Sequence, residues 1–359
     1  MSISLKMNFC HYYYFRIGCI KIKLTHCASF LLKMNMSSTL LSSLESTSKY
    51  LYRYGGVLLI GFGTIGCSLN ILVFNQKKFC KNPCSIYFLI ANIFNLLFIH
   101  SLLLMTTLES GFNIHLNVKN LLLCRLCFYT SLISNVLSTY CLLLASFNRA
   151  LVTSPQYFVQ NRAGQHFAYI HILFGTIFWM IFHSPALIFT NITSYNRNIS
   201  ICFYQTGFYL TFIGYYSIVK ESLSSLLLII LGVWTINNLR RSRRSSYFAV
   251  SFRKTSIPRS ITRPNDRQFI FMVLTDIIIF SVCSSSAAIF LTHQQLTQYQ
   301  EKSFEKIQLD LFLKHVAIFC LHIPFCISCY TNVLVSRAYR QAVRNIFSNS
   351  NESHLHPIH

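Results

Sequence analysis

The stretch from Cys124 to Pro155 reads CRLCFYTSLISNVLSTYCLLLASFNRALVTSP, and it decides the fold of this chain. It is apolar over most of its length, and Arg149 follows the opening cysteine by 25 residues. As one α-helix this separation measures about 37 Å, longer than the hydrocarbon core of a bilayer. An arginine at the end of a spanning helix either reaches lipid phosphates or makes a specific contact. The stretch therefore predicts a spanning helix with Cys124 at one membrane face and Arg149, a candidate switch residue, at the other.

The composition of the whole chain is that of a membrane protein. Of its 359 residues, 53% are apolar and only 11% are charged, which lies outside the range of soluble globular domains. Seven apolar runs are long enough to span a bilayer, where a helix satisfies all of its own backbone polar groups. The runs are residues 51–74, 85–105, 121–152, 166–190, 207–236, 268–292 and 311–335. The sequence thus predicts an all-α, seven-transmembrane helix bundle that forms one domain over residues 51–336.

The positions of the basic residues predict the orientation of this bundle. The formal net charge is +22, but the basic residues gather in alternate loops, after the first, third, fifth and seventh runs. The positive-inside rule then places the N-terminus outside the cell and the C-terminus in the cytosol. Basic loops of this kind contact anionic lipid or an acidic partner surface. We therefore expect a multi-pass protein of the plasma membrane that contacts membrane lipids and does not bind nucleic acid.

The two ends of the chain flank this domain. Residues 1–33 carry five basic and no acidic residues on the predicted extracellular side, against the rule, and they lack the apolar core of a signal peptide. We expect residues 1–50 to form an extracellular tail, of which residues 1–33 are untranslated if translation begins at Met34. Residues 337–359 are expected to contain a short amphipathic helix, over 340–347, and a cytosolic tail.

Of the 11 cysteines that follow residue 50, two fall at predicted extracellular positions. Cys124 opens the third helix and Cys202 lies in the loop after the fourth, so a disulfide between them would tie that loop across the mouth of the bundle. Cys127, one helical turn from Cys124, is the competing partner. Three sequons lie on the same predicted side and are the expected glycosylation sites: Asn35, Asn191 and Asn198.

Taken together, these features resemble the rhodopsin-like (class A) G-protein-coupled receptors. The resemblance covers roughly residues 55–347, and it includes the cysteine that opens the third helix and Asn148-Arg149 at its inner end. Asn70, which closes Gly66-Cys-Ser-Leu-Asn70, is similar to the bundle-facing polar residue of the first helix. The resemblance implies a receptor that binds an extracellular ligand and passes a helix rearrangement to a heterotrimeric G protein. The switch residues that it implies are Asn70, Asn95, Asn148, Arg149, Phe280 and Asn332.

Several switch motifs depart from the pattern of this family. Phe280-Ser-Val-Cys283-Ser284 keeps the Phe and Cys of the sixth-helix motif but has Ser284 for its tryptophan, and the region of Asn332 lacks the usual Pro and Tyr. Asn148 stands where an acidic residue usually pins the arginine, and a neutral amide leaves at most a weaker hydrogen bond. We therefore expect a raised basal activity. Asn95 replaces the aspartate that would hold a sodium ion, so no metal or cofactor is expected.

A ligand pocket that opens to the outside is also implied. Lys220 and Glu221 interrupt the fifth helix, and ionisable residues at that depth suggest a role. Consecutive residues point about 100° apart on a helix, so we expect only Glu221 to face the pocket, unless both reach the outer interface. The residues implied to line the pocket are Ser131, Asn135, Glu221, Ala287, Leu291, Lys314 and His322. Because Ser131 stands where amine receptors carry an aspartate, we expect a peptide and not a monoamine.

Two other classes of function remain open. One alternative is a decoy receptor that binds its ligand without coupling to a G protein, and the less favoured one is a transporter or channel. A transporter would favour paired inverted repeats or helices broken at matching places, which the sequence does not contain. It also contains no convincing zinc pair, Ser/His/Asp arrangement or Gly-rich phosphate loop, so we do not expect an enzyme.

Overall fold

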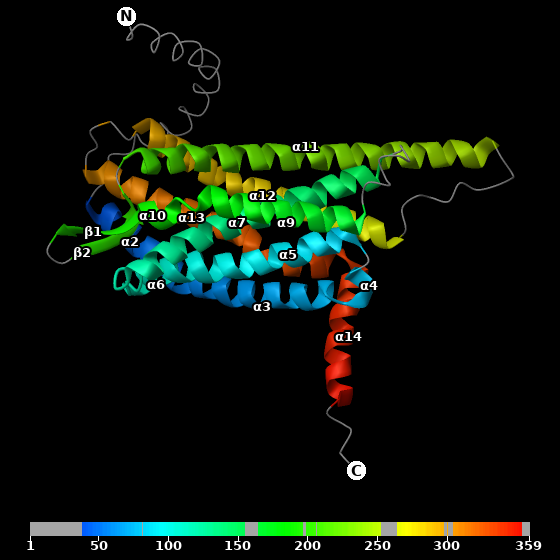
Figure 1. Cartoon of the computed structure of the whole chain (residues 1–359), viewed down its shortest axis with the longest axis horizontal. Helices are drawn as coiled ribbons and strands as arrows, with labels where there is room; N and C mark the ends of the chain where they lie inside the picture. The colour runs from blue at the N-terminus through cyan, green and yellow to red at the C-terminus, as the bar shows by residue number, and fades with distance from the viewer. Residues whose placement is uncertain are drawn as a thin grey trace, which may run out of the picture.

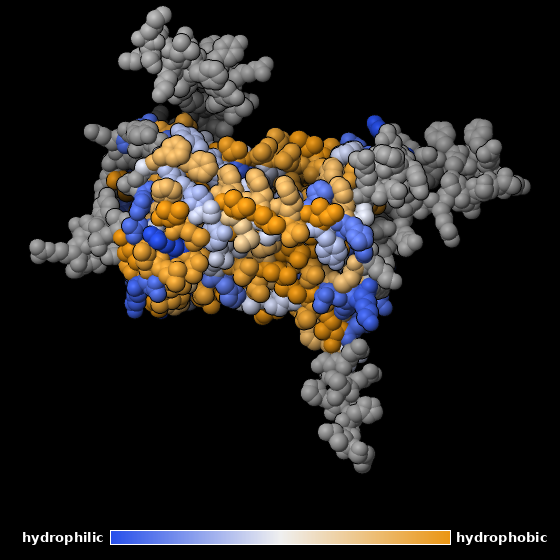
Figure 2. Space-filling model, viewed as in Figure 1, coloured by the Kyte–Doolittle hydropathy of each residue, from blue (hydrophilic) through white to orange (hydrophobic). Residues whose placement is uncertain are grey.

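The computed structural model describes residues 38–80, 82–154, 164–196, 199–205, 207–252, 264–297, 300 and 304–353. Within these ranges, seven helices are long and apolar enough to cross a membrane, and each overlaps one of the predicted runs. Figure 1 shows them packed side by side, and Figure 2 shows a broad apolar band on the visible face, with hydrophilic residues towards its two ends. The prediction of an all-α, seven-transmembrane bundle is therefore confirmed, and the chain is a multi-pass membrane protein.

The first span consists of α2 (Ser38–Tyr50), the π-helical η1 (Leu51–Gly56) and α3 (Val57–Phe74). After the short α4 (Lys77–Cys80), the second span consists of α5 (Pro83–Phe98), η2 (Ile99–Leu103) and α6 (Leu104–Phe112). The third is α7 (Leu121–Val152), and the fourth is α9 (Gln165–His183) with α10 (Ala186–Phe189). The antiparallel strands β1 (Thr190–Asn196) and β2 (Ile199–Tyr204) form a hairpin before the last three spans. These are α11 (Phe208–Phe252), α12 (Pro264–Thr297) and α13 (Phe304–Val335), and α14 (Arg337–Ser353) follows them.

The bundle has two distinct ends, which we call the hairpin end and the α14 end (Figure 1). At the second of these, α14 runs away from the bundle, across the direction of the spanning helices. It begins earlier and ends later than the predicted 340–347. Tyr339 and Ala342 are buried against the bundle while Gln341 and Arg344 are exposed, so the helix has one packed and one solvent-facing side. Burial, with a smaller effect of Cys329, raises the pKa of Tyr339, and its hydroxyl stays a protonated donor at physiological pH.

Two boundaries differ from the sequence-based expectation. Residues 38–50, expected within an exposed tail, form α2, and its buried Ser48 bonds to His315 Nδ1 at 2.6 Å. The fifth span does not end near residue 236, because α11 continues to Phe252. No glycine or proline interrupts residues 237–252, so nothing in this stretch breaks the helix. Its 45 residues rise about 68 Å, which is more than twice the thickness of a bilayer core.

Close packing of α3 against its neighbours depends on a glycine. A Cβ atom at Gly63 would lie 2.7 Å from Ile99 Cδ1 and 2.9 Å from Cys326 Sγ. Both distances are shorter than a Cβ atom tolerates, so a larger residue forces η2 or α13 to move. Gly61 lies on the same helix, but a Cβ there would meet no atom within 4 Å.

We expect Gly63→Ala to destabilise the bundle by about 1–3 kcal/mol, because inserting a methyl group into a packed interface strains it. Gly61→Ala introduces the same methyl group at an open position and should change stability little. Thermal unfolding of the two purified variants in detergent, compared with the unsubstituted protein, measures the difference. Equal stability of the two variants would contradict this account of the packing.

Candidate functional site

A disulfide fixes the hairpin over one end of the bundle. Cys124, in the first turn of α7, is bonded to Cys202 of β2, and their Cα atoms lie 5.9 Å apart. The predicted pair is therefore confirmed, and the competing Cys127 is a free thiol. Arg125 adds a second tie, because its Nε donates to the Thr190 carbonyl oxygen at 3.0 Å.

The hairpin itself was not expected from the sequence, and it carries one of the predicted glycosylation sites. Asn191 lies in β1, and its Oδ1 accepts a hydrogen bond from the Ile192 amide at 2.9 Å. The other two expected sites, Asn35 and Asn198, lie outside the described residues.

Beside the hairpin end, a cavity of about 190 Å³ lies between α7, α11, α12 and α13; we call it the hairpin-end cavity. Six of the seven residues expected to line a pocket line this cavity: Ser131, Asn135, Glu221, Ala287, Leu291 and Lys314. His322 is not among its lining residues. It is fully buried, it bonds to the Ile318 carbonyl oxygen at 2.6 Å and its ring stacks on Phe98 at 5.0 Å. Phe98 thus lines the cavity and His322 packs against that ring, so the placement expected for His322 is wrong.

The rest of the cavity wall is mainly apolar. Its members follow the predicted residues at helical spacing, since Phe290 and Gln294 lie one and two turns after Ala287, and Ala317 and Leu321 follow Lys314 in the same way. This periodicity is the sequence signal that could have found them. The lining residues beyond those expected are Phe98, Leu102, Leu132, Val136, Tyr216, Ser217, Lys220, Phe290, Gln294, Ala317, Ile318 and Leu321.

Lys220 and Glu221 both line the cavity, so the expectation that only Glu221 would do so is wrong. Lys220 Nζ forms an ion pair with Glu221 Oε1 and donates to Asn135 Oδ1 at 2.6 Å. The long lysine stem lets the ammonium turn back toward its neighbour, which a comparison of Cβ directions overlooks. Both side chains are buried, at 11% and 4% exposure, so neither reaches a membrane interface.

Ser284 completes this group, because its hydroxyl donates to Glu221 Oε2. We call the linked residues Asn135, Lys220, Glu221 and Ser284 the polar clasp. It joins α7, α11 and α12 at the cavity wall. Each buried charge in the clasp has an opposite charge and a neutral hydrogen-bond partner, which is the condition under which ionised groups are tolerated away from water.

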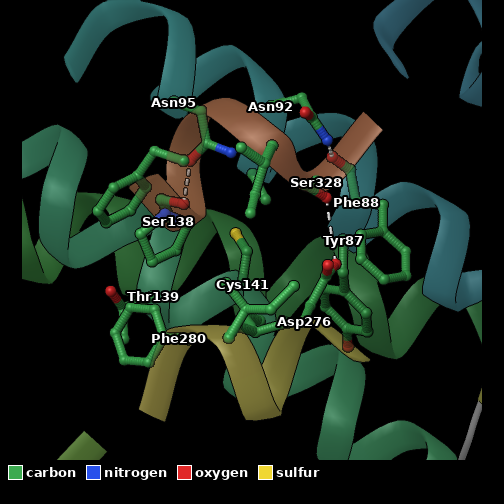
Figure 3. A pocket seen from close by; sticks show the side chains of 16 residues that line it. Tyr87, Phe88, Asn92, Asn95, Ser138, Thr139, Cys141, Asp276, Phe280 and Ser328 are labelled. Carbon is green, nitrogen blue, oxygen red and sulfur yellow. Dashed lines mark hydrogen bonds between the residues drawn. The ribbon is translucent and has the colours of Figure 1, made fainter. Parts of the chain in front are cut away.

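A smaller cavity of about 40 Å³ lies deeper in the bundle, between α5, α7, α12 and α13 (Figure 3). Asn95 and Asp276 face it from different helices, and Phe280 also lines it. Asn95 Oδ1 accepts a hydrogen bond from Ser138, and Asp276 Oδ2 accepts one from Ser328 at 3.1 Å. Asn95 itself brings no charge to this region, and α12 supplies a carboxyl group through Asp276.

Asp276 lies inside the sixth span, on α12. Its partners are hydroxyl groups, since Thr331 Oγ1 also donates to its Oδ1 at 3.3 Å. Within the described part of the chain, no basic nitrogen lies within 4.0 Å of this carboxyl group. Among the same residues, no group of three His, Cys, Asp or Glu side chains could hold a metal ion.

Asn70 joins four helices toward the α14 end. Its Nδ2 donates to Asn92 Oδ1 at 2.8 Å, and its Oδ1 accepts from the Tyr339 hydroxyl at 2.6 Å and from Asn332 Nδ2 at 3.4 Å. The partner on α5 is Asn92 and not the expected switch residue Asn95. Both amides lie on the buried side of α5, three residues apart, and only their packing distinguishes them.

At the α14 end, Arg149 is buried, with only 1% of its surface exposed. Its Nη2 donates to Asn82 Oδ1, the residue that caps α5, and its guanidinium carbon lies 5.5 Å from the ring centre of Phe269 on α12. A cation over an aromatic face is a favourable contact. Arg149 therefore makes specific contacts with two helices and does not extend to lipid phosphates. Asn148 is buried too, and its Oδ1 has no hydrogen-bond partner among the described residues.

Comparison with known proteins gives no match: no family model and no curated protein sequence aligns with the chain. The features of the molecule that bear on its function are the two cavities, the polar clasp and the contacts of Arg149.

Proposed function

We propose that this chain is a receptor of the rhodopsin-like class, which binds an extracellular ligand in the hairpin-end cavity and signals to a heterotrimeric G protein at the α14 end. The observation that carries this proposal is that the same two helices contribute to both places. α7 supplies Asn135 to the polar clasp and Arg149 to the α14 end, about 21 Å apart along the helix. α12 supplies Ser284 and Phe269 in the same way.

This arrangement gives a physical route for signalling. A ligand that alters the hydrogen bond between Ser284 and Glu221 changes the seating of α12 at the cavity. Because α12 is one continuous helix, the change reaches Phe269, which lies against Arg149. A ligand shifts such an equilibrium only by the difference in its affinity for the two states. Release of Arg149 from Phe269 is the event that would open a surface for the G protein.

The orientation and location are part of the proposal. Basic residues near the α14 end, such as Lys77, Arg240 and Arg344, support a cytosolic position for that end under the positive-inside rule. The hairpin end, with the disulfide and Asn191, is then extracellular, as expected for a receptor of the plasma membrane. Membrane lipids cover the apolar band.

A nucleotide-exchange assay tests the proposal. Membranes from cells that express the chain at the surface are mixed with a panel of heterotrimeric G proteins, alone and with a neuropeptide library. We expect exchange above that of membranes without the chain, and we expect Arg149→Met at equal surface expression to abolish it. Peptide binding without exchange would indicate a decoy receptor, and substrate flux or ion current would indicate a transporter or channel.

Asn148→Asp is expected to lower basal nucleotide exchange, because a carboxylate beside Arg149 can hold its guanidinium by an ion pair that the amide cannot form. A difference of about 1 kcal/mol between the two kinds of bond corresponds to a roughly fivefold decrease. Gln341→Glu is the control, since it makes the same amide-to-acid change on the exposed side of α14. If basal exchange is unchanged in Asn148→Asp at matched surface expression, the role assigned to Asn148 is wrong.

A further inference from the structure

The ionisable residues of the hairpin-end cavity do not balance in charge. Three of them line it, namely Lys220, Glu221 and Lys314. Lys220 and Glu221 neutralise each other within the polar clasp. In the described part of the chain, no carboxylate oxygen lies within 4.0 Å of Lys314 Nζ. Glu109, which lines an adjoining cavity, is the carboxylate that acts on Lys314 electrostatically, from farther away than the 4.0 Å of an ion pair. The residues that line this cavity therefore carry one excess positive charge.

Lys314 is held where it can meet a ligand. It projects from α13 and is half-buried, and its ammonium lies 5.8 Å from the ring centre of Phe203, the neighbour of the disulfide-bonded Cys202. An aromatic face attracts a cation, but it satisfies none of the three N–H donors of the ammonium group. The residues described here provide no hydrogen-bond acceptor for that group at bonding distance. Its donors are thus available to an incoming anion.

The rest of the cavity suits an apolar group. Phe98, Phe290 and Leu321 line it together with several smaller apolar residues. An apolar body fills such a wall well, whereas a second cation would add charge to a site that already has an excess of it. A carboxylate supplies the missing counter-charge and accepts strong, charge-assisted hydrogen bonds from an ammonium group.

We propose that the hairpin-end cavity binds a ligand that carries one carboxylate on an apolar body, with the carboxylate on Lys314 Nζ. This rests on the proposed receptor function and names the chemical class of its ligand. The adjoining cavity, of about 60 Å³, shares Leu102 and Ser131 with this one and leads past Cys202. A longer ligand extends along it toward the hairpin. The carboxylate can come from the C-terminus of a peptide or from a free organic acid.

Binding of matched acids and amides to the purified chain in lipid nanodiscs tests this directly. The peptide arm uses N-acetyl-Gly-Gly-Phe, which has no N-terminal charge, with a free C-terminus and with an amidated one. The organic-acid arm uses 4-phenylbutyrate and 4-phenylbutanamide. We expect the acid of at least one arm to raise the unfolding temperature in a saturable manner, and its amide to bind at least tenfold more weakly. The arm that responds at the lower concentration identifies the source of the carboxylate.

Substitutions of lysines on one helix assign the effect to Lys314. Lys314→Gln should weaken binding of the acid by tenfold or more, while Lys314→Arg keeps the charge and should retain much of the affinity. Lys306→Gln is the matched control, because Lys306 is an exposed lysine on the same helix, outside the cavity. Unliganded unfolding temperatures show that each variant is folded.

Three results would overturn the proposal: no acid binds, acid and amide bind equally, or Lys306→Gln weakens binding as much as Lys314→Gln. The assay contains no G protein, so it is independent of nucleotide exchange. A chain that binds acids but never promotes exchange would refute the coupling function and leave the ligand class standing.

Discussion

Glu221→Gln is expected to lower the free energy of unfolding by about 3–5 kcal/mol, because it leaves the ammonium group of Lys220 buried without its counter-ion. The two side chains are 11% and 4% exposed, so bulk water screens their interaction little. Glutamine keeps the shape of the side chain and can still accept from the hydroxyl of Ser284. The loss therefore reports the charge of the polar clasp and not its packing.

A double-mutant cycle separates the pair from its surroundings. Lys220→Met alone should also destabilise, because it leaves the Glu221 carboxylate buried without a cation. The double variant Lys220→Met/Glu221→Gln removes both charges and should regain most of the stability, as replacing a whole buried ion pair often does. Thermal unfolding and surface expression of the four proteins complete the cycle. Additive losses, or single variants as stable as the parent, would show that the clasp contributes little.

Cys202→Ser is expected to destabilise the fold by about 4 kcal/mol, since the disulfide closes a loop with a sequence separation of 78 residues. This value applies to an unfolded chain that is free in solution. Because the membrane already restrains the spanning helices within this loop, the loss of stability should be smaller. The substitution also releases β2, and with it Phe203, from its position near Lys314. Binding of carboxylate ligands should therefore weaken together with stability.

Cys127→Ser is the matched control for this experiment, because Cys127 is a free thiol one turn from Cys124. It should behave like the parent protein in unfolding and in ligand binding. Treatment of the parent with a reducing agent should reproduce the behaviour of Cys202→Ser and leave that variant unaffected. If both serine variants unfold at the same temperature, the disulfide does not hold the hairpin.

Much of the fold could be predicted from the sequence, because hydropathy and helix length constrain a spanning helix strongly. The disulfide followed from the predicted positions of Cys124 and Cys202 on one side of the membrane. The β1–β2 hairpin could not be predicted in this way, because short strands depend on contacts with the rest of the fold. The hairpin is held to α7 through Cys202 and Arg125.

For the candidate site, the sequence predicted most of the lining positions but not all of the side-chain contacts. Positions such as Ser131, Asn135 and Lys314 followed from their place on the helices together with the resemblance to the receptor family. The errors concern contacts that helix phase does not determine. The lysine stem lets Lys220 reach Glu221, and the ring of Phe98 separates His322 from the cavity.

Because α11 is one unbroken helix, a displacement at one point along it can be transmitted to its far end. Asn238 Nδ2 donates to the Ala150 carbonyl oxygen at 3.2 Å, and this bond fixes α11 to α7 at a point between Lys220 and Phe252. The helix extends about 27 Å from Asn238 to Lys220 and about 21 Å from Asn238 to Phe252. A displacement at the polar clasp would therefore reach Phe252 somewhat reduced and in the opposite direction. If the hydrogen bond of Asn238 breaks, α11 would tilt about the polar clasp instead. A tilt of about 10° would then displace Phe252 by roughly 8 Å. The side-chain amide of Asn238 would thus determine both the size and the direction of a displacement transmitted along α11.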